Sequence, residues 1–412
     1  MNSNEVFLET ADRIAAVLCR DAVWDGDRCT WLGDSMEYID FQPKVVHQAL
    51  GPEVYGGTSG IALFLAKCFS YTKDRIFRSV AEGAIHQALA RADELPHQTQ
   101  TSFYSGILGV AYAAIEVGSA LNSPELVERG LSLSRRCCVV KASEQMLDVI
   151  SGCGSGIPVF LHLYKGFHDS QFLTAAVSLG EQIVNQADQK EEGWSWQTSA
   201  PSEASRNLCG YGHGTAGIGL ALLELHAVTK CSRFLEGANE AFDYEKTHFD
   251  VGEQNYPDFR LSPQARKSAG PSFMAAWCHG APGIALSRIR AYELTRVEQY
   301  RDEADIALQS TIRSLSKING NYQSNYSLCH GIGGNASILL YASRVFPHDE
   351  YRRMAIDAGL SGIEHYPKSR VPWTCGIQHG GRTPNLMLGT AGVGYFYLNL
   401  YSSEVNVPLL IQ

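Results

Sequence analysis

The stretch Ala276-Trp277-Cys278-His279-Gly280-Ala281-Pro282-Gly283 returns, in altered form, at Leu328-Cys329-His330-Gly331-Ile332-Gly333-Gly334. Each copy has a Cys-His-Gly unit, a second glycine three positions after the first, and then an apolar run. Thiol and imidazole groups together form a ligand set that zinc takes in proteins. The two cysteines lie 51 residues apart, which is not a zinc-finger spacing. If they meet, the fold must bring them together.

The glycine pair of these units occurs seven times and predicts the architecture of the chain. The first glycines stand 46 to 66 residues apart, at Gly57, Gly106, Gly152, Gly214, Gly280, Gly331 and Gly389. The third copy is irregular, because Ser155 takes the place of the second glycine and Gly156 follows. The helix predicted after each pair is apolar nearly all round, as a buried helix is. Glycine at a helix start lets neighbouring backbones approach closely and permits unusual φ values.

A second kind of helix precedes each glycine pair. The first has its apolar residues at helical spacing, with charges between them: Phe7, Ala11, Ile14, Ala15 and Leu18. Six further amphipathic patterns lie near residues 77–95, 125–140, 171–188, 233–250, 298–318 and 351–366. We therefore predict an all-α fold, an α/α toroid of seven inner and seven outer helices, as a single domain over residues 1–412. We expect a closed ring because the first and last copies are no more polar than the others, whereas solenoid ends need polar caps.

Strand signals are sparse, and the longest segments predicted to be irregular are residues 21–56, 189–212, 251–276 and 367–388. Each of them runs into a glycine pair. We expect them to gather on one face of the toroid, and loops of this length usually carry function.

Composition excludes several classes of protein. The chain has 412 residues with 45% hydrophobic and 19% charged residues, which is typical of a globular protein. A net charge of −9 argues against nucleic acid as a partner. No apolar run reaches the length of a transmembrane helix, and the first residues have no secretory signal pattern. The odd number of cysteines, 11, indicates reduced thiols and a cytoplasmic protein.

The two Cys-His-Gly units predict a metal site. Adjacent inner helices of a toroid are neighbours, so Cys278, Cys329 and His330 can converge on one zinc ion. Three protein ligands leave the fourth position open, as in catalytic zinc sites. By spacing alone, His279 is as good a ligand as His330. The alternative is that both cysteines are simply buried at helix starts, with no metal.

His213 and Asp148 are candidates for proton transfer. His213 directly precedes the first glycine of the fourth pair, and the pKa of an imidazole lies near neutrality. The alternative is a histidine satisfied by loop backbone. Asp148 is flanked by apolar residues and would need a partner if buried. It can orient His213 or carry a proton, or it can serve as an N-terminal cap of the third inner helix.

Seven further residues in the segments before the glycine pairs are weaker candidates. Two thiols can replace a ligand named above, three aromatic residues can line a substrate site or only pack, and a histidine and an arginine can belong to a substrate loop. They are Cys209, Cys375, Trp277, Trp373, Tyr211, His379 and Arg382.

Three motifs resemble the lanthionine synthetase C-like cyclases: Gly212-His213-Gly214-Thr215-Ala216-Gly217-Ile218, Trp277-Cys278-His279-Gly280-Ala281-Pro282-Gly283 and Cys329-His330-Gly331. With the seven glycine-led helices, the resemblance covers nearly the whole chain. It implies a toroid of seven plus seven helices with one zinc ion. It also implies zinc ligands at Cys278, Cys329 and His330, which sets His279 aside. Acid/base roles for His213 and Asp148 follow from the same resemblance.

Residues 255–260 and 383–395 resemble the cyclase half of the bifunctional, LanM-type synthetases. The large dehydratase half of those enzymes is absent from this sequence. The resemblance therefore implies either a free-standing cyclase with a separate dehydratase as partner, or a piece of a longer chain.

The sequence thus favours a zinc-dependent lanthipeptide cyclase. Its substrate would be a dehydrated precursor peptide, whose Cys thiols add to dehydroalanine or dehydrobutyrine and form lanthionine or methyllanthionine rings. A transferase that adds glutathione to small electrophiles needs the same zinc and is an alternative. A non-catalytic, zinc-stabilised scaffold that binds peptides is another. A toroidal glycosidase would need two carboxylates at the ring mouth, where only Asp148 is well placed.

Overall fold

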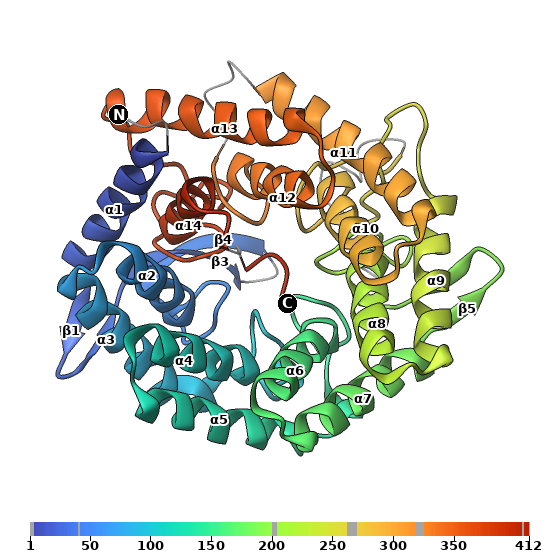
Figure 1. Ribbon diagram of the computed structural model, residues 1–412, viewed down its shortest axis with the longest axis horizontal. Coiled ribbons are helices and arrows are strands. Elements are labelled where there is room, and N and C mark those ends of the chain that lie inside the picture. Colours follow the sequence, from blue (N-terminus) through green and yellow to red (C-terminus); the bar gives the residue numbers. More distant parts are fainter. Residues whose placement is uncertain are drawn as a thin grey trace.

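The computed structural model describes residues 4–39, 42–199, 204–261, 270–318, 325–405 and 408–411. Fourteen α-helices of these residues form two concentric rings (Figure 1), so the predicted α/α toroid is confirmed. The outer helices are α1 (Glu5–Arg20), α3 (Arg75–Arg91), α5 (Pro124–Cys138), α7 (Ser170–Asn185), α9 (Ser232–Thr247), α11 (Glu298–Ile318) and α13 (Asp349–Ile363). The inner helices are α2 (Thr58–Thr72), α4 (Ile107–Leu121), α6 (Cys153–Phe167), α8 (Thr215–Thr229), α10 (Ala281–Thr295), α12 (Ile332–Val345) and α14 (Thr390–Tyr401).

The two ends of the helical chain close the ring. Six inner helices pack on the outer helix that follows them, from α2 on α3 to α12 on α13. The last inner helix, α14, has no outer helix after it and packs instead on α1, the first outer helix (Figure 1). The stripe of α1 that this contact buries includes Phe7, Ala11 and Ile14. The predicted closure is therefore confirmed, and it hides the apolar faces that an open solenoid would expose.

The inner helices are buried because they are covered from both sides. In α8, every residue from Thr215 to Leu225 is buried, whereas α1 buries only one stripe. Five inner helices have the same length of 15 residues. Each of these five ends at a residue in the left-handed conformation, and a tight turn then starts the outer helix: Lys73, Asn122, His168, Lys230 and Arg296. Such turns reverse the chain within two residues at one face of the ring.

The glycine pairs are required by close approach of backbone. The loop before each inner helix folds back over the start of that helix. A Cβ atom on Gly283 would lie 2.0 Å from the carbonyl oxygen of Trp277, and one on Gly334 would lie 1.9 Å from that of Leu328. Among the seven leading glycines, Gly280 alone has a positive φ, +87°. Crowding by carbonyl oxygens therefore explains the repeat better than backbone conformation does.

The irregular third copy keeps the same fold. Helix α6 still begins after Gly152, and Ser155 stands where the other copies have glycine. Its hydroxyl accepts a hydrogen bond from the amide of Phe103 (3.0 Å) and donates one to the carbonyl oxygen of Gly152 (3.3 Å). Gly154, one residue earlier, approaches the loop backbone in this copy: a Cβ atom on it would lie 3.0 Å from the carbonyl carbon of Asp148.

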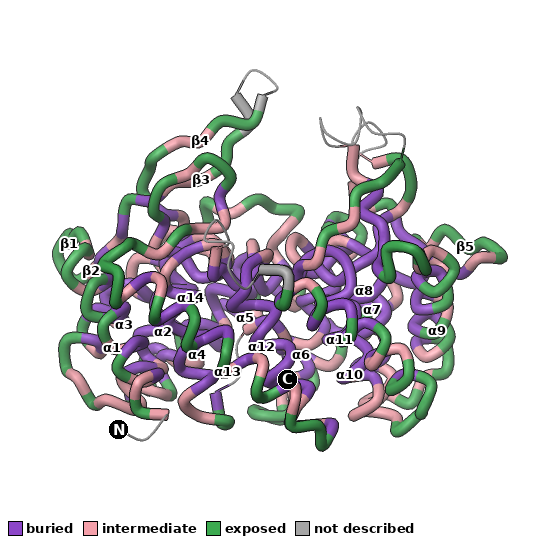
Figure 2. Tube along the Cα trace, turned by 90° about the horizontal axis from the view of Figure 1, so that it is seen from above, coloured by how far each residue is buried: buried purple, intermediate pink, exposed green. Residues whose placement is uncertain are grey.

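Two segments predicted to be irregular contain strands. Residues 21–56 form two antiparallel hairpins, β1 (Val23–Asp25) with β2 (Arg28–Thr30) and β3 (Leu32–Ile39) with β4 (Gln42–Ala49). A third hairpin pairs β5 (Asp188–Lys190) with β6 (Gly193–Ser195). Strands β3 and β4 rise from one face of the ring (Figure 2). The prediction of loops was wrong here. Strands β3 and β4 are largely exposed and lack the apolar alternation of a buried face, and the other four strands are only three residues long.

The C-terminal residues 408–411 lie at the centre of the ring (Figure 1). The indole of Trp277 donates a hydrogen bond to the carbonyl oxygen of Leu409 (3.1 Å), and the hydroxyl of Tyr104 donates one to that of Pro408 (2.9 Å). Leu409 and Ile411 are buried. This segment therefore packs directly behind the loop that carries Cys278. Among the described helices, none is long and apolar enough to cross a membrane.

Candidate metal centre

A belt of backbone hydrogen bonds ties the seven loops together at equivalent positions. Each loop contributes the residue two positions before its leading glycine: Tyr55, Tyr104, Ile150, Gly212, Cys278, Cys329 and Met387. Six of these residues donate their amide to the carbonyl oxygen of the next one around the ring. The bonds run from Ile150 to Gly212 (3.1 Å), and then on to Cys278 (3.0 Å), Cys329 (3.4 Å), Met387 (3.0 Å), Tyr55 (3.0 Å) and Tyr104 (2.9 Å). The amide of Tyr104 donates instead to the hydroxyl of Ser102 (3.0 Å). The hydroxyl of Ser102, near Tyr104, completes the belt by donating to the carbonyl oxygen of Ile150 (2.7 Å).

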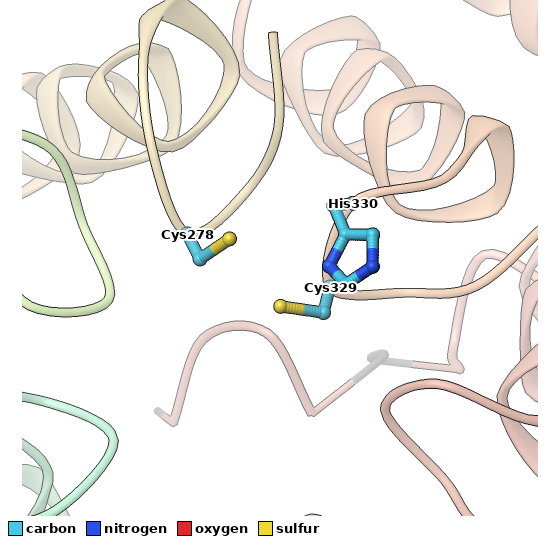
Figure 3. Close-up of side chains that lie close together, drawn as sticks. All are labelled: Cys278, Cys329 and His330. Atoms are coloured by element: carbon cyan, nitrogen blue, oxygen red, sulfur yellow. The ribbon is translucent and has the colours of Figure 1, made fainter. Parts of the chain in front are cut away.

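The belt places Cys278 and Cys329 side by side. They precede α10 and α12, which are neighbours in the inner ring. Their sulfur atoms and a ring nitrogen of His330 all lie within 4.8 Å of one another. Figure 3 shows both sulfur atoms and the imidazole pointing into one common space. These three side chains form a candidate metal site, at the place where the sequence predicts one.

The donor set fits a tetrahedral metal ion. Ligand atoms at zinc–sulfur distances stand about 3.8 Å apart at the corners of a tetrahedron, which agrees with the close grouping of Cys278, Cys329 and His330. The ring Nε2 of His330 lies 2.6 Å from the carbonyl oxygen of Gly376. A carbonyl only accepts, so Nε2 carries the proton and Nδ1 keeps the lone pair that a metal requires. Such a partner for the second nitrogen is usual for histidine ligands.

The two thiols do not ionise alike. The hydrogen bond from Cys329 lowers the pKa of the Cys278 thiol well below its ordinary value, and His330 acts in the same direction against burial. Burial raises the pKa of Cys329, and its bond to Cys278 adds to the rise. The phenol of Tyr55 donates a hydrogen bond to Cys329 and opposes that rise. The cluster thus stabilises negative charge on sulfur, as a metal-binding thiolate site must.

His213 and Asp148 are in direct contact. Nδ1 of His213 shares a short hydrogen bond with Oδ2 of Asp148, and the other oxygen of Asp148 accepts from the amide of Ser151 at 2.7 Å. Asp148 is 2% exposed, and it does not cap α6, whose N-cap is Gly152. Burial lowers the pKa of His213, but the charge of Asp148 and the hydrogen bond to it outweigh burial and raise that pKa. Nε2 of His213 takes no part in the contact with Asp148.

His279 lies outside the ligand cluster and turns towards His213. The centroids of the two imidazole rings are 5.7 Å apart. His279 is 1% exposed, and neither of its ring nitrogens has a hydrogen-bond partner among the described residues. Burial lowers the pKa of His279 to about 4, so the ring is neutral near pH 7. A buried, unpartnered imidazole is costly unless a ligand satisfies it.

Residues 255–260 support the side of the site on which His213 and His279 lie. The sequence did not predict this role. Oδ1 of Asn255 accepts a hydrogen bond from the amide of Ala281 (2.9 Å) and so caps α10 from another segment. Asp258 is buried and binds the guanidinium of Arg260 through contacts of 2.6 and 3.0 Å. Arg260 adds a fixed positive charge that acts on His213, His279 and both thiols.

A buried ion pair supports the loop that carries His213. Arg288 of α10 and Glu245 of α9 are 1% and 0% exposed and lie 2.9 Å apart. The other oxygen of Glu245 accepts from the amide of Gly210 (2.9 Å), which has a φ of +97°. The loop that carries His213 is therefore anchored to the helix that follows Cys278. These contacts join distant segments, so no local sequence signal could reveal them.

The weaker candidates divide by burial. Cys209 and Cys375 lie outside the cluster of potential ligands. Trp277 and Tyr211 are buried and pack against each other, with ring centroids 5.5 Å apart. The other three stand at the surface: Trp373 is half-buried, whereas His379 and Arg382 are exposed.

The fold and the cluster define a class: a helical toroid with two thiols and one imidazole gathered between adjacent inner helices. Residues 48–410 match the family described as lanthionine synthetase C-like protein, and the chain belongs to this family. The structure resembles that of nisin cyclase, with a TM-score of 0.66 and 16% identity over 86% of this chain and 89% of that one. At this identity the likeness shows the fold alone.

Two curated proteins are also similar in sequence. The lacticin 481/lactococcin biosynthesis protein LcnDR2 of Lactococcus lactis subsp. lactis is 22% identical over 99% of this chain and 42% of its own length. The glutathione S-transferase LANCL1 of Danio rerio is 27% identical over 46% of this chain and 42% of its own length. The matched regions thus span less than half of either relative.

Proposed function

We propose that the protein is a zinc-dependent cyclase of dehydrated peptides. The observation that carries the proposal is the convergence of Cys278, Cys329 and His330, with Nε2 of His330 hydrogen-bonded to the carbonyl oxygen of Gly376. Among the described residues the cluster has three members, and three protein ligands are the set that catalytic zinc takes. Membership of the lanthionine synthetase C-like family supports it. So does similarity to a protein of lacticin 481 biosynthesis.

The donor set suits the chemistry of thiol addition. Cys278, Cys329 and His330 would hold the zinc ion, and the ion would supply a positive charge that lowers the pKa of a substrate thiol. Two thiolate ligands place negative charge on the site, which favours a nucleophilic sulfur over an activated water. The chain's own contribution is to hold these donors in a buried, preorganised cluster.

His213 provides the proton in this proposal. Addition of sulfur to the β-carbon of a dehydroamino acid forms a carbon–sulfur bond and leaves an enolate. The ring Nε2–H of His213 protonates the α-carbon, and the proton released by the thiol restores His213, so no co-reactant is consumed. Asp148 fixes the ring through Nδ1 and favours the protonated state by raising the pKa of His213 against burial.

His279 would face the substrate amide. Both its nitrogens are buried and have no hydrogen-bond partner in the part of the chain that the structure describes. Its ring follows Cys278 directly in sequence, and its centroid lies 5.7 Å from that of the His213 ring. We propose that a ring N–H of His279 donates to the carbonyl oxygen of the dehydroamino acid, where charge develops as the enolate forms. The neutral imidazole suits this role, because it keeps one N–H that can donate a hydrogen bond to the oxygen where charge develops.

A second candidate is addition of glutathione to an electrophile. The observation that favours it is the similarity to a glutathione S-transferase over 46% of the chain. Mass spectrometry of a dehydrated, cysteine-containing peptide incubated with the protein and glutathione separates the two. Ring closure consumes a peptide thiol without a change in mass, whereas transfer adds the mass of glutathione. We expect ring closure; transfer as the dominant reaction would contradict the cyclase.

A non-catalytic scaffold is the remaining alternative. It predicts that removal of zinc unfolds the protein and that His213→Ala changes no reaction. The cyclase predicts that the metal-free protein keeps the helical toroid, whose core is built by the fourteen helices, and that His213→Ala slows ring closure. Circular dichroism of the chelator-treated protein, together with a cyclisation assay of His213→Ala, distinguishes the two.

A further inference from the structure

A groove of about 600 Å³ lies between the end of α1, the first two hairpins and the loop that precedes α14. Four of the exposed large hydrophobic residues of the protein line it: Val17 (43%), Val23 (55%), Leu32 (56%) and Val371 (42%). Exposed apolar side chains that gather in one concave place indicate a binding surface. Neither the metal cluster nor the His213–Asp148 pair uses this groove.

One wall of the groove is built from aromatic and proline side chains. Trp373 stacks on Tyr366 with ring centroids 4.3 Å apart, and both rings line the groove. Tyr366 lies in a π-helical turn, Glu364–Lys368, a geometry that is frequent at functional sites. Pro367, Pro372 and Pro384 stand in the same wall. Aromatic and proline side chains lose little conformational entropy when a ligand binds, so this wall is preorganised.

The rim carries a surplus of positive charge. Arg20 also lines the groove but is bound to Asp21 at 2.7 Å. Arg370 and Arg382 also line the groove and are exposed, and among the described residues neither is part of an ion pair. The protein as a whole has a net charge of −9, so two unneutralised arginines beside an apolar groove select an acidic ligand.

The loop that forms the groove also supports the metal cluster. Gly376, whose carbonyl oxygen accepts the hydrogen bond of His330, follows Trp373 by three residues. Their Cα atoms therefore lie at most about 11 Å apart. A peptide seated on Trp373 would reach the cluster with a few further residues, each of which spans about 3.3 Å when extended.

We propose that this groove binds an apolar, acidic segment of the precursor peptide, a few residues away from the cysteine that reacts. The inference rests on the proposed function. A volume of about 600 Å³ accepts a few side chains, whereas a folded protein partner needs a broad face of roughly 800 Å². The valines and the two rings take the apolar side chains, and Arg370 and Arg382 bind the carboxylates.

Fluorescence anisotropy of short labelled peptides tests the proposal without cyclisation. The probe alternates leucine with glutamate and contains no cysteine, serine or threonine; a second probe has lysine in place of glutamate. We expect the glutamate probe to bind the zinc-loaded protein. The double variant Arg370→Glu/Arg382→Glu should weaken its binding about tenfold or more, since both charge-assisted contacts are lost. The same variant should bind the lysine probe more tightly than the unaltered protein does.

Arg353→Glu is the matched control, because Arg353 is an exposed arginine on α13 that does not line the groove. It should leave the affinity for both probes within about twofold.

With a dehydrated peptide as substrate, the groove variant should have a higher KM than the unaltered protein, with the same kcat and zinc content. Equal affinity of unaltered and groove-variant protein for the glutamate probe, or equal loss in Arg353→Glu, would overturn the proposal. A groove variant that instead keeps its affinity for the glutamate probe and loses its affinity for a separate dehydratase would also overturn the proposal. That result would assign the groove to the dehydratase. Because the probes have no thiol, this result stands apart from whether the protein is a cyclase.

Discussion

His330 donates a hydrogen bond from Nε2 to the carbonyl oxygen of Gly376, at 2.6 Å, and so turns its Nδ1 towards the sulfur atoms of Cys278 and Cys329. Gly376 is two helices away in sequence, in the loop that leads to α14. The orientation of this proposed zinc ligand therefore depends on a loop that supplies no member of the cluster.

Gly376→Ala should weaken zinc binding by about 10- to 100-fold, as loss of such a supporting contact usually does. A Cβ at this position would stand 2.9 Å from Nε2 of His330, so the imidazole must move. Gly166→Ala is the control, because its Cβ would meet nothing within 4 Å. Competition with a fluorescent zinc chelator measures both. Equal zinc affinity in the two variants would show that Gly376 does not orient the ligand.

Asp148→Asn should lower the rate of cyclisation by about 100-fold or more, because Asp148 keeps His213, the proposed proton donor, in its protonated state. Burial lowers the pKa of His213, and the carboxylate of Asp148 more than offsets this. Without that charge the pKa falls. A proton donor is lost as the pH rises through its pKa, so the alkaline limb of the pH–rate profile should move to lower pH. An unmoved limb would exclude His213 as the donor.

The same pair should make stability depend on pH. The folded-state pKa of His213 is raised, so its stabilising contribution is complete below about pH 6.5, the ordinary histidine value, and is lost as the pH rises through the folded-state pKa. Urea unfolding at several pH values should show this decline in the unaltered protein and a weaker one in Asp148→Asn. Parallel curves for the two proteins would contradict the assignment.

Arg288→Met should reduce the free energy of unfolding by about 3–5 kcal/mol, because it leaves Glu245 as an unpaired buried charge. Arg233→Met is the matched control: its pair with Glu181 is exposed, and its loss should cost about 1 kcal/mol or less. Denaturant unfolding compares the two. If both variants lose the same free energy of unfolding, the buried ion pair does not anchor the loop that carries His213 to α10.

Much of the fold could be predicted from the sequence because one physical constraint recurs seven times. Each glycine pair marks the point where a loop folds over a helix start, so the helices and their order follow from the pattern. Closure was predictable from the apolar first and last copies. The β3–β4 hairpin was not, since Asp34, Ser35 and Glu37 of β3 give no apolar face, although Asp34 binds His47 across the hairpin at 2.7 Å.

The site was predictable in part for the same reason. Cys278 and Cys329 hold equivalent positions in adjacent repeats, and this equivalence predicts that they meet. Spacing alone could not separate His279 from His330, because both follow a cysteine directly. The resemblance to a known family chose His330, and the structure places its ring, not that of His279, within the cluster. Arg260 and Glu245 act across segments distant in sequence, so no motif pointed to them.

The most direct test of the central claim is the rate at which free thiols disappear from a dehydrated peptide, measured for the unaltered protein, Cys329→Ala and Cys375→Ala. Cys375 adjoins Gly376 but lies outside the cluster. A cyclase with this zinc site should consume the thiols as the unaltered protein and as Cys375→Ala, whereas Cys329→Ala should leave a rate near that of the peptide alone. Cyclisation by Cys329→Ala at the rate of the unaltered protein would contradict the claim.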